Sequence, residues 1–84
     1  MKISVLYFGE LRESVDTAQE ASEVVDGSTV SDLIEHLKAR GEPWQSALTS
    51  PDPLRVAVNK DMANLNTVLT EGAEVAMFRP VTGG

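Results

Sequence analysis

Residues 29–41 read Thr-Val-Ser-Asp-Leu-Ile-Glu-His-Leu-Lys-Ala-Arg-Gly and carry the clearest helix signal in the chain. Thr29 is a favourable N-cap residue, and Asp32 follows it at the spacing of a capping box, although Glu or Gln is the commoner partner there. Gly41 is a typical C′ residue, because glycine readily adopts the left-handed backbone that ends many helices. We therefore predict a helix over residues 30–40. Its apolar side chains share one face, which other elements must cover: Val30, Leu33, Ile34 and Leu37.

Strand-like segments flank this helix on both sides in the sequence. They are rich in β-branched or aromatic residues, and most are followed by a turn signal such as glycine, proline or asparagine. The predicted strands are residues 3–8, 21–25, 54–59 and 75–78, with a short helix over residues 10–15 and a return segment over residues 62–69. Because strands precede and follow one main helix, the simplest packing is an α+β roll in which a mixed sheet wraps that helix.

The predicted sheet has two apolar faces. Side chains alternate along a strand, so each strand presents one set of residues to the helix and the other set outward. The set assigned to the helix is Ile3, Val5, Val56, Val58, Val75 and Met77. The set assigned to the outer face is Leu6, Phe8, Ala76 and Phe78, with Met62 nearby. An apolar patch on an open sheet face indicates a protein interface, and the alternative is that a loop covers it.

The composition excludes several classes of function. The 84 residues suffice for one domain, and a net charge of −6 argues against binding to nucleic acid or to an anionic membrane, since both favour clustered Lys and Arg. The chain contains no cysteine and one histidine, so it lacks a thiolate nucleophile and the ligands of a thiolate or multi-histidine metal site. We therefore expect no bound metal. No apolar stretch could span a bilayer and no signal-peptide pattern opens the chain, so we also expect a cytoplasmic protein.

Two conspicuous side chains have ordinary structural interpretations. His36 lies off the apolar stripe of the helix, beside Asp32 and Arg40, so we expect a solvated surface histidine rather than a base or a ligand. Trp44 follows Pro43, which suits the first position of a short helical turn. We therefore expect Trp44 to close one end of the core rather than to form a binding platform.

The last residues of the chain offer backbone rather than side-chain chemistry. Residues 79–84 read Arg-Pro-Val-Thr-Gly-Gly and directly follow the last predicted strand. Because glycine lacks a Cβ atom, a Gly-Gly end can pass through a narrow channel, and the α-carboxylate of Gly84 is sterically unhindered. We therefore predict a domain over residues 1–80 that presents a flexible tail over residues 81–84. The alternative is a frayed terminus without a function.

Several stretches of the sequence are similar to one known family. Residues 5–13, Val-Leu-Tyr-Phe-Gly-Glu-Leu-Arg-Glu, resemble the opening strand and short helix of the small subunits of molybdopterin synthase. Residues 57–59 match a later strand of that family, and residues 69–84 resemble its closing strand and Gly-Gly tail. The resemblance covers nearly the whole chain. It implies the ubiquitin-like β-grasp fold, which agrees with the roll expected from the residue pattern.

The resemblance implies a sulfur carrier for molybdenum cofactor biosynthesis. Gly84 would be adenylated with ATP by a separate activating enzyme and then converted to a thiocarboxylate, with sulfur from a sulfur-donating enzyme. Val81, Thr82 and Gly83 would thread the tail into the active site of the large synthase subunit, in a heterotetramer. There the sulfur would pass to cyclic pyranopterin monophosphate, and two transfers would build the dithiolene of molybdopterin. The chain itself would bind no cofactor and supply no catalytic side chain.

The same resemblance assigns partner contacts to four residues. The partner-binding face of the family maps onto Phe8, Met62 and Phe78, which largely coincide with the outward-facing apolar residues deduced above. Arg79 is a departure, because relatives often carry proline at this position. An arginine there could pair with an acidic residue of the partner. The departure bears on the stiffness of the tail rather than on sulfur chemistry.

Three other functions are compatible with the same tail. A sulfur carrier for thiamin or another thio-metabolite shares the fold and the Gly-Gly end, although such carriers are usually shorter and lack the insertion that contains Trp44. A ubiquitin-like modifier would be joined through Gly84 to lysines of target proteins. A plain interaction module with an accidental Gly-Gly end is the third alternative.

Overall fold

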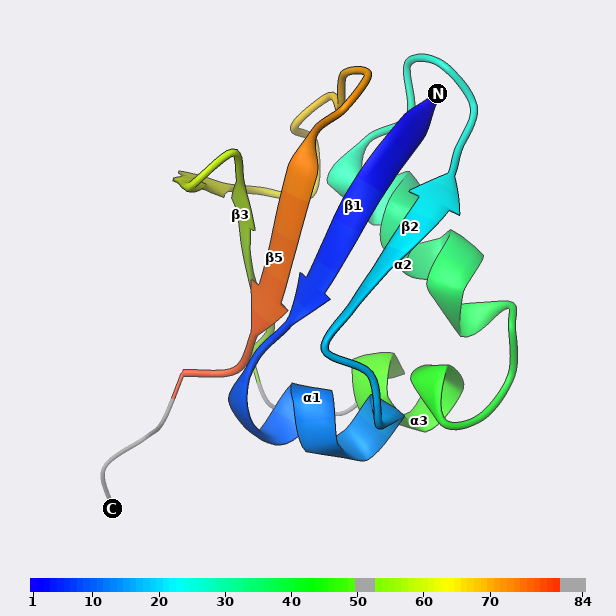
Figure 1. The fold of residues 1–84 in the computed structure, drawn as a ribbon, viewed down its shortest axis with the longest axis vertical. Coiled ribbons are helices and arrows are strands. Elements are labelled where there is room, and N and C mark those ends of the chain that lie inside the picture. Colours follow the sequence, from blue (N-terminus) through cyan, green and yellow to red (C-terminus); the bar gives the residue numbers. More distant parts are fainter. Residues whose placement is uncertain (50–52, 81–84) are drawn as a thin grey trace.

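A five-stranded mixed sheet carries the main helix on one of its faces (Figure 1). The computed structural model describes residues 1–49 and 53–80. In chain order the elements are β1 Lys2–Tyr7, α1 Gly9–Val15, β2 Gln19–Glu23, α2 Val30–Lys38, α3 Trp44–Thr49, β3 Arg55–Val58, β4 Asp61–Ala63 and β5 Glu74–Phe78. This order and the mixed sheet confirm the α+β roll expected from the sequence.

The strands lie in the order β2-β1-β5-β3-β4 across the sheet. β1 pairs with β5 in parallel, whereas the other neighbouring strands are antiparallel. The first and last strands therefore lie side by side and run toward the same end of the sheet, where α1 lies (Figure 1). The segments that follow these two strands are also joined, because the backbone N–H of Phe8 donates to the carbonyl oxygen of Met77 at 3.1 Å.

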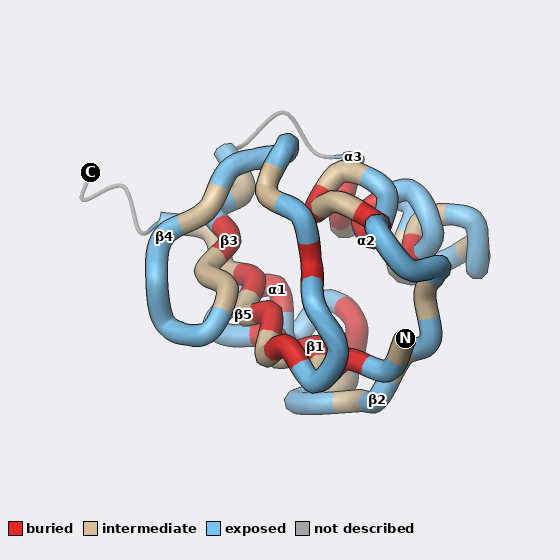
Figure 2. The backbone as a smooth tube through the Cα atoms, turned by 90° about the horizontal axis from the view of Figure 1, so that it is seen from above, coloured by how far each residue is buried: buried red, intermediate tan, exposed pale blue. Residues whose placement is uncertain are grey.

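The core lies between the sheet and α2, and its buried positions follow β1, β5 and α2 (Figure 2). The four residues of the predicted helix stripe are buried, which confirms the amphipathic face. The set assigned to the inner face of the sheet is also buried, except that Val58 is partly buried against the same core. Removing this apolar surface from water stabilises the fold by roughly 25 cal/mol per Å².

The predicted capping box of α2 is present. Thr29 Oγ1 accepts from the backbone N–H of Asp32 at 3.2 Å, and Asp32 Oδ2 accepts from the backbone N–H of Thr29 at 2.9 Å. The first helical amides, of Val30 and Ser31, donate to carbonyl oxygens of the loop between β4 and β5, each at 3.0 Å. The N-terminal donors of the helix are thereby paired, as a buried helix end requires.

The helix ends earlier than predicted. The last helical residue is Lys38 and the C-cap is Ala39, so Gly41 lies two residues beyond the cap rather than directly after it. Gly41 still has the left-handed backbone expected of it, with φ of 90°. The backbone N–H groups of Arg40 and Gly41 donate to carbonyl oxygens three residues earlier, so the chain leaves α2 through tight turns.

The second strand also differs from the prediction. β2 covers Gln19–Glu23, two residues earlier than the predicted strand over residues 21–25. The prediction followed the apolar residues of this segment, but Val25 is 80% exposed and lies outside the strand. β2 is a polar edge strand, and its antiparallel pairing with β1 fixes its position. Its own hydrophobic pattern therefore gives little information about where it begins and ends.

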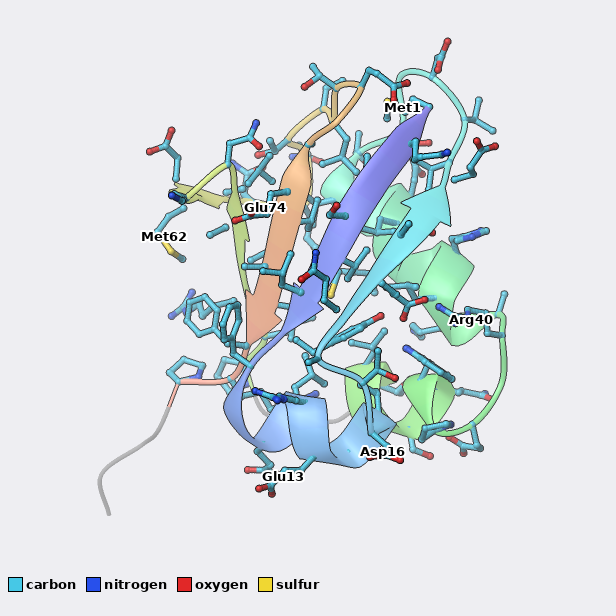
Figure 3. The ribbon with its side chains drawn as sticks, viewed as in Figure 1. Met1, Glu13, Asp16, Arg40, Met62 and Glu74 are labelled. Atoms are coloured by element: carbon cyan, nitrogen blue, oxygen red, sulfur yellow. The ribbon has the colours of Figure 1, made fainter. Side chains whose placement is uncertain are left out.

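A chain of polar contacts joins three elements of the fold and the turn that follows α2. The hydroxyl of Tyr7 in β1 donates to Glu20 Oε2 in β2 at 2.9 Å and accepts from Trp44 Nε1 in α3 at 3.1 Å. Arg40, after α2, donates from Nη1 to Glu20 Oε1 at 2.8 Å, and its guanidinium lies 4.1 Å from the centroid of the Trp44 ring (Figure 3). Trp44 therefore packs against the core as predicted and also ties α3 to the sheet. His36 is exposed, as expected.

Removal of the α2 cap gives a first test of the fold. Thr29→Ala should lower the free energy of unfolding by about 1 kcal/mol, because the N–H of Asp32 loses its acceptor. Chemical denaturation followed by circular dichroism measures this change. Thr70→Ala is the matched control: Thr70 is exposed, and its substitution should stay within about 0.5 kcal/mol. Equal stabilities of the two variants would contradict the capping role.

Alkaline titration gives a second test. Tyr7 is the only tyrosine of the chain and is 1% exposed. Burial, followed by the hydrogen bond to Glu20, raises the pKa of its hydroxyl. The stability that Tyr7 contributes is therefore complete below the pKa of an unfolded tyrosine, about 10, and is lost as the pH rises above it. We expect tyrosinate absorbance to appear only together with loss of the native circular dichroism. If the Tyr7 hydroxyl ionises near the pKa of an unfolded tyrosine while the chain stays folded, the expectation is wrong.

Candidate functional site

Four side chains form one row across the outer face of the sheet. In the strand register, Leu6 of β1 is opposite Ala76 of β5, Ala76 is opposite Ala57 of β3, and Ala57 is opposite Met62 of β4. Opposite residues of neighbouring strands project from the same side of a sheet. Because the adjacent residues along β1, β3 and β5 point into the core, this row points away from it.

Two phenylalanines extend the row toward the end of the sheet where β1 and β5 finish. Phe8 and Phe78 lie two residues beyond Leu6 and Ala76, and both continue the outward alternation; Phe8 is the N-cap of α1 but keeps an extended backbone. Phe8 is 46% exposed and Met62, at the sheet edge in Figure 3, is 63% exposed. We call these six residues the outer patch: Leu6, Phe8, Ala57, Met62, Ala76 and Phe78.

The outer face changes from polar to apolar along its length. Near the start of β5, Glu74 is opposite Ser4, and Lys2 is the next outward residue of β1 (Figure 3). The outer patch occupies the other half, at the end from which the chain continues to Arg79 and Pro80. An exposed apolar patch with a polar surround is typical of a protein interface. The outer patch and the root of the predicted tail, Arg79 and Pro80, therefore lie at the same end of the sheet.

The centre of the patch is lined by small side chains. Ala57 and Ala76 place methyl groups between the larger side chains of Leu6 and Met62. The centre therefore stands lower than its sides, and this profile can accept a bulky apolar side chain from a partner. The alanine of β3 was absent from the outer set expected from the sequence. The alternation of Ala57 with the inward-facing Val56 could have indicated that Ala57 faces outward. Its place beside Ala76 follows only from the pairing of β3 with β5.

Arg79 connects the end of β5 to α3. Its Nη2 donates to the backbone carbonyl oxygen of Ala47. The residue is half-buried, and its Nε–H is buried without an acceptor among residues 1–49 and 53–80. The side chain lines an open pocket of about 350 Å³ together with residues of α1 and α3 and of the segment before α3: Glu10, Ser14, Pro43, Ser46 and Ala47. The guanidinium thus packs toward the helices.

The part of the chain that the structure describes contains no evident catalytic machinery. No group of three or more His, Asp or Glu side chains there is placed to hold a metal ion, and no described helix is long and apolar enough to cross a membrane. Burial raises the pKa of Tyr7, and hydrogen bonds from Ser46 lower the pKa of Glu42. Both shifts have structural causes, and neither residue belongs to the outer patch. Neither shift marks a functional group at the end of the sheet where β1 and β5 finish.

The structure brings together three of the four residues assigned to partner binding. Phe8, Met62 and Phe78 all belong to the outer patch, in agreement with the predicted outer face. Arg79 adjoins the patch in sequence, but its side chain contacts α3. Contact of these four residues with a partner stays a prediction. The tail residues Val81, Thr82, Gly83 and Gly84 lie outside the described residues.

Comparison with known proteins gives matches along the whole chain. Residues 5–84 match the ThiS family. The molybdopterin synthase sulfur carrier subunit of Escherichia coli (strain K12) is 43% identical over 83 residues, which cover 98% of this chain and 99% of that protein. The protein of the same name from Mycobacterium tuberculosis is 38% identical over 85 residues, which cover 100% of this chain and 99% of that protein.

Solved structures share the fold. SAMP1 from Haloferax volcanii superposes with a TM-score of 0.82 at 26% identity, over 100% of both chains. A protein–protein complex of subunits 1 and 2 of molybdopterin-converting factor from Helicobacter pylori contains a chain with a TM-score of 0.67 at 22% identity, again over 100% of both chains. These likenesses confirm the predicted ubiquitin-like β-grasp fold. Together with the full-length sequence matches, they show that this chain belongs to the ThiS family.

Proposed function

We propose that this chain is the sulfur carrier subunit of a molybdopterin synthase, acting in the cytoplasm. The observation that carries the proposal is its 43% identity, over 98% of its length, to a protein of that name. The chain also ends in Gly84, an unhindered carboxylate that sulfur chemistry can use. The outer patch supports the proposal, because a carrier without catalytic groups must dock on the enzymes that have them.

The carboxylate of Gly84 needs activation, because an ionised carboxylate has no good leaving group. We assign ATP to a separate activating enzyme. There a carboxylate oxygen attacks the α-phosphorus of ATP, pyrophosphate leaves, and a glycyl adenylate forms. A sulfur-donating enzyme then supplies sulfur at the oxidation level of sulfide, which displaces AMP and leaves a thiocarboxylate. The carrier itself is assigned no bound cofactor.

The thiocarboxylate is a nucleophile, and we assign cyclic pyranopterin monophosphate as its target. The large synthase subunit would hold this substrate, and Val81, Thr82 and Gly83 would thread the tail toward it. The thiocarboxylate sulfur attacks an electrophilic carbon of the substrate and an oxygen substituent of that carbon leaves, so that a C–S bond replaces a C–O bond. Attack of water on the acyl carbon then breaks the acyl C–S bond, which leaves the sulfur on the substrate and returns Gly84 as a carboxylate. Two transfers supply the two sulfur atoms of the dithiolene. By its likeness to the synthase carriers, we expect the chain to assemble with the large subunit as a heterotetramer.

The position of the outer patch suits this delivery. The six residues after Phe78 span at most about 20 Å when fully extended. A partner that covers the end of the outer patch must therefore place its active site within that distance of β5. The large subunit can meet this condition by docking on Phe8 and Phe78, which lie beside the tail root.

A ubiquitin-like protein modifier is a second candidate. It is favoured by the likeness to SAMP1, whose name denotes a small archaeal modifier protein. An activated Gly84 would then form an amide bond with a lysine of a target protein. The two functions share the activation step and differ in the acceptor. Covalent ladders formed in a cell extract with ATP would favour the modifier, and sulfur delivery to another thio-metabolite would favour the thiamin-type carrier.

Deletion of Gly84 separates the chemistry from the fold. The buried core ends at Met77, so the free energy of unfolding should change by less than about 0.5 kcal/mol. With the activating enzyme, ATP and a sulfur source, the intact mass of the full chain should rise by the replacement of one oxygen by sulfur. The truncated chain should not convert, because its shorter tail no longer brings a carboxylate to the adenylating centre.

Two outcomes of this experiment would contradict the proposed role of Gly84. If the full chain keeps only its free carboxylate under these conditions, the carrier proposal is wrong. If the deletion lowers the melting temperature strongly, the terminal residue belongs to the fold rather than to a tail that serves only in transfer.

Substitution in the outer patch tests the docking surface. Phe8→Ala and Met62→Ala should each weaken binding of the large subunit by about tenfold or more, as expected for central apolar contacts of an interface. Isothermal titration calorimetry measures the affinity. Val25→Ala is the matched control, because Val25 is also apolar, is 80% exposed and lies outside the outer patch. If all three variants bind like the unmodified chain, the partner uses another surface.

A further inference from the structure

We propose that Arg79 is a positioning residue that clasps the root of the tail to α3 and so fixes the direction in which the chain leaves the domain. The inference rests on the proposed function, because this direction matters only if Gly84 must enter the active site of another protein. The clasp itself is a contact within this chain. It can therefore be tested whether or not sulfur transfer takes place.

The clasp acts at the point where the last strand ends. Arg79 directly follows Phe78, the final residue of β5, and its Nη2 donates to the carbonyl oxygen of Ala47. Ala47 lies in the last turn of α3, where carbonyl groups lack helical donors. The residue four positions later is Pro51, which has no N–H to offer. Arg79 thus supplies a charged donor to a carbonyl that the helix cannot satisfy in the usual way.

The other end of the clasp is firmly held. Trp44 in α3 donates to Tyr7 in β1 and packs against the core, and Leu48 of α3 is buried. At the start of α3, the carboxylate of Glu42 accepts from the backbone N–H of Ser46 at 2.8 Å and from its hydroxyl at 2.5 Å. The carbonyl of Ala47 therefore belongs to a short helix fixed at both ends, and it gives the guanidinium a defined anchor.

A fixed root lowers the entropy that the tail loses when it enters a partner. Ordering the backbone of one residue costs about 1–2 kcal/mol. If Arg79 must be ordered on binding because the clasp is absent, the carrier should associate with its partner about 5- to 30-fold more weakly. The sulfur-transfer step itself uses atoms at Gly84 and not Arg79. Loss of the clasp should therefore raise KM for the carrier and leave kcat unchanged.

The experiment compares Arg79→Ala and Arg79→Lys with the unmodified chain, and Arg12→Ala serves as control. Arg12 is an exposed arginine of α1, so its variant loses the same charge without touching the contact to α3. Trp44 fluorescence verifies that each variant is folded. The first readout is the ¹⁵N order parameter of the amide at position 79 in the free chain. The second is KM and kcat for sulfur transfer to the purified large subunit, with the thiocarboxylate installed chemically so that activation plays no part.

If Arg79 holds the root of the tail to α3, we expect the amide at position 79 to have an order parameter near 0.85 in the unmodified chain and below about 0.6 in Arg79→Ala. We also expect a 5- to 30-fold higher KM for this variant, an intermediate effect for Arg79→Lys, and no effect for Arg12→Ala. An unchanged order parameter in Arg79→Ala overturns the proposal. The proposal also fails if Arg79→Lys restores KM fully while its order parameter at position 79 stays as low as in Arg79→Ala, because that result assigns Arg79 to an ion pair with the partner. If neither the unmodified chain nor any variant transfers sulfur, the proposed function is wrong. The order parameter alone then tests whether Arg79 holds the root of the tail to α3.

Discussion

The parallel pairing of β1 with β5 is the constraint on which the rest of the structure depends. Parallel neighbours cannot be joined by a tight turn, so the intervening chain must cross from one end of the sheet to the other. Here the intervening chain supplies the edge strands β2 and β4, each antiparallel to its neighbour, and α2, which covers one face of the sheet (Figure 1). The pairing also brings Phe8, which follows β1, beside the final residues of β5. One pairing therefore places the outer patch and the root of the predicted tail together.

The same strands carry the core on one face and the outer patch on the other. The inward residues of β1 and β5 are almost completely buried against α2, whereas the outward residues near the end of these strands form the outer patch. This separation shows how an 84-residue chain can bury a core on one side of its sheet and still expose apolar side chains on the other.

The sequence was most informative where one residue pattern determines the outcome locally. The capping box at Thr29 and the alternation in β1 and β5 predicted the main helix and the outer face, and both agree with the structure. The position of β2 was not predictable from its own polar residues, because pairing with β1 determines it. The contact between Arg79 and Ala47 joins residues 32 apart in sequence, and it depends on where α3 packs. No local pattern contains that information.

If this chain is the sulfur carrier proposed above, Gly84 delivers sulfur to a pterin substrate. The most direct measurement is to install an isotopically labelled sulfur in the thiocarboxylate of Gly84 and to follow it by mass spectrometry during a reaction with the large subunit and cyclic pyranopterin monophosphate. We expect that both sulfur atoms of the dithiolene carry the label and that the carrier returns with a free carboxylate. A dithiolene without the label, a label that stays on the carrier, or labelled sulfide released while Gly84 forms an amide with a lysine would contradict this delivery.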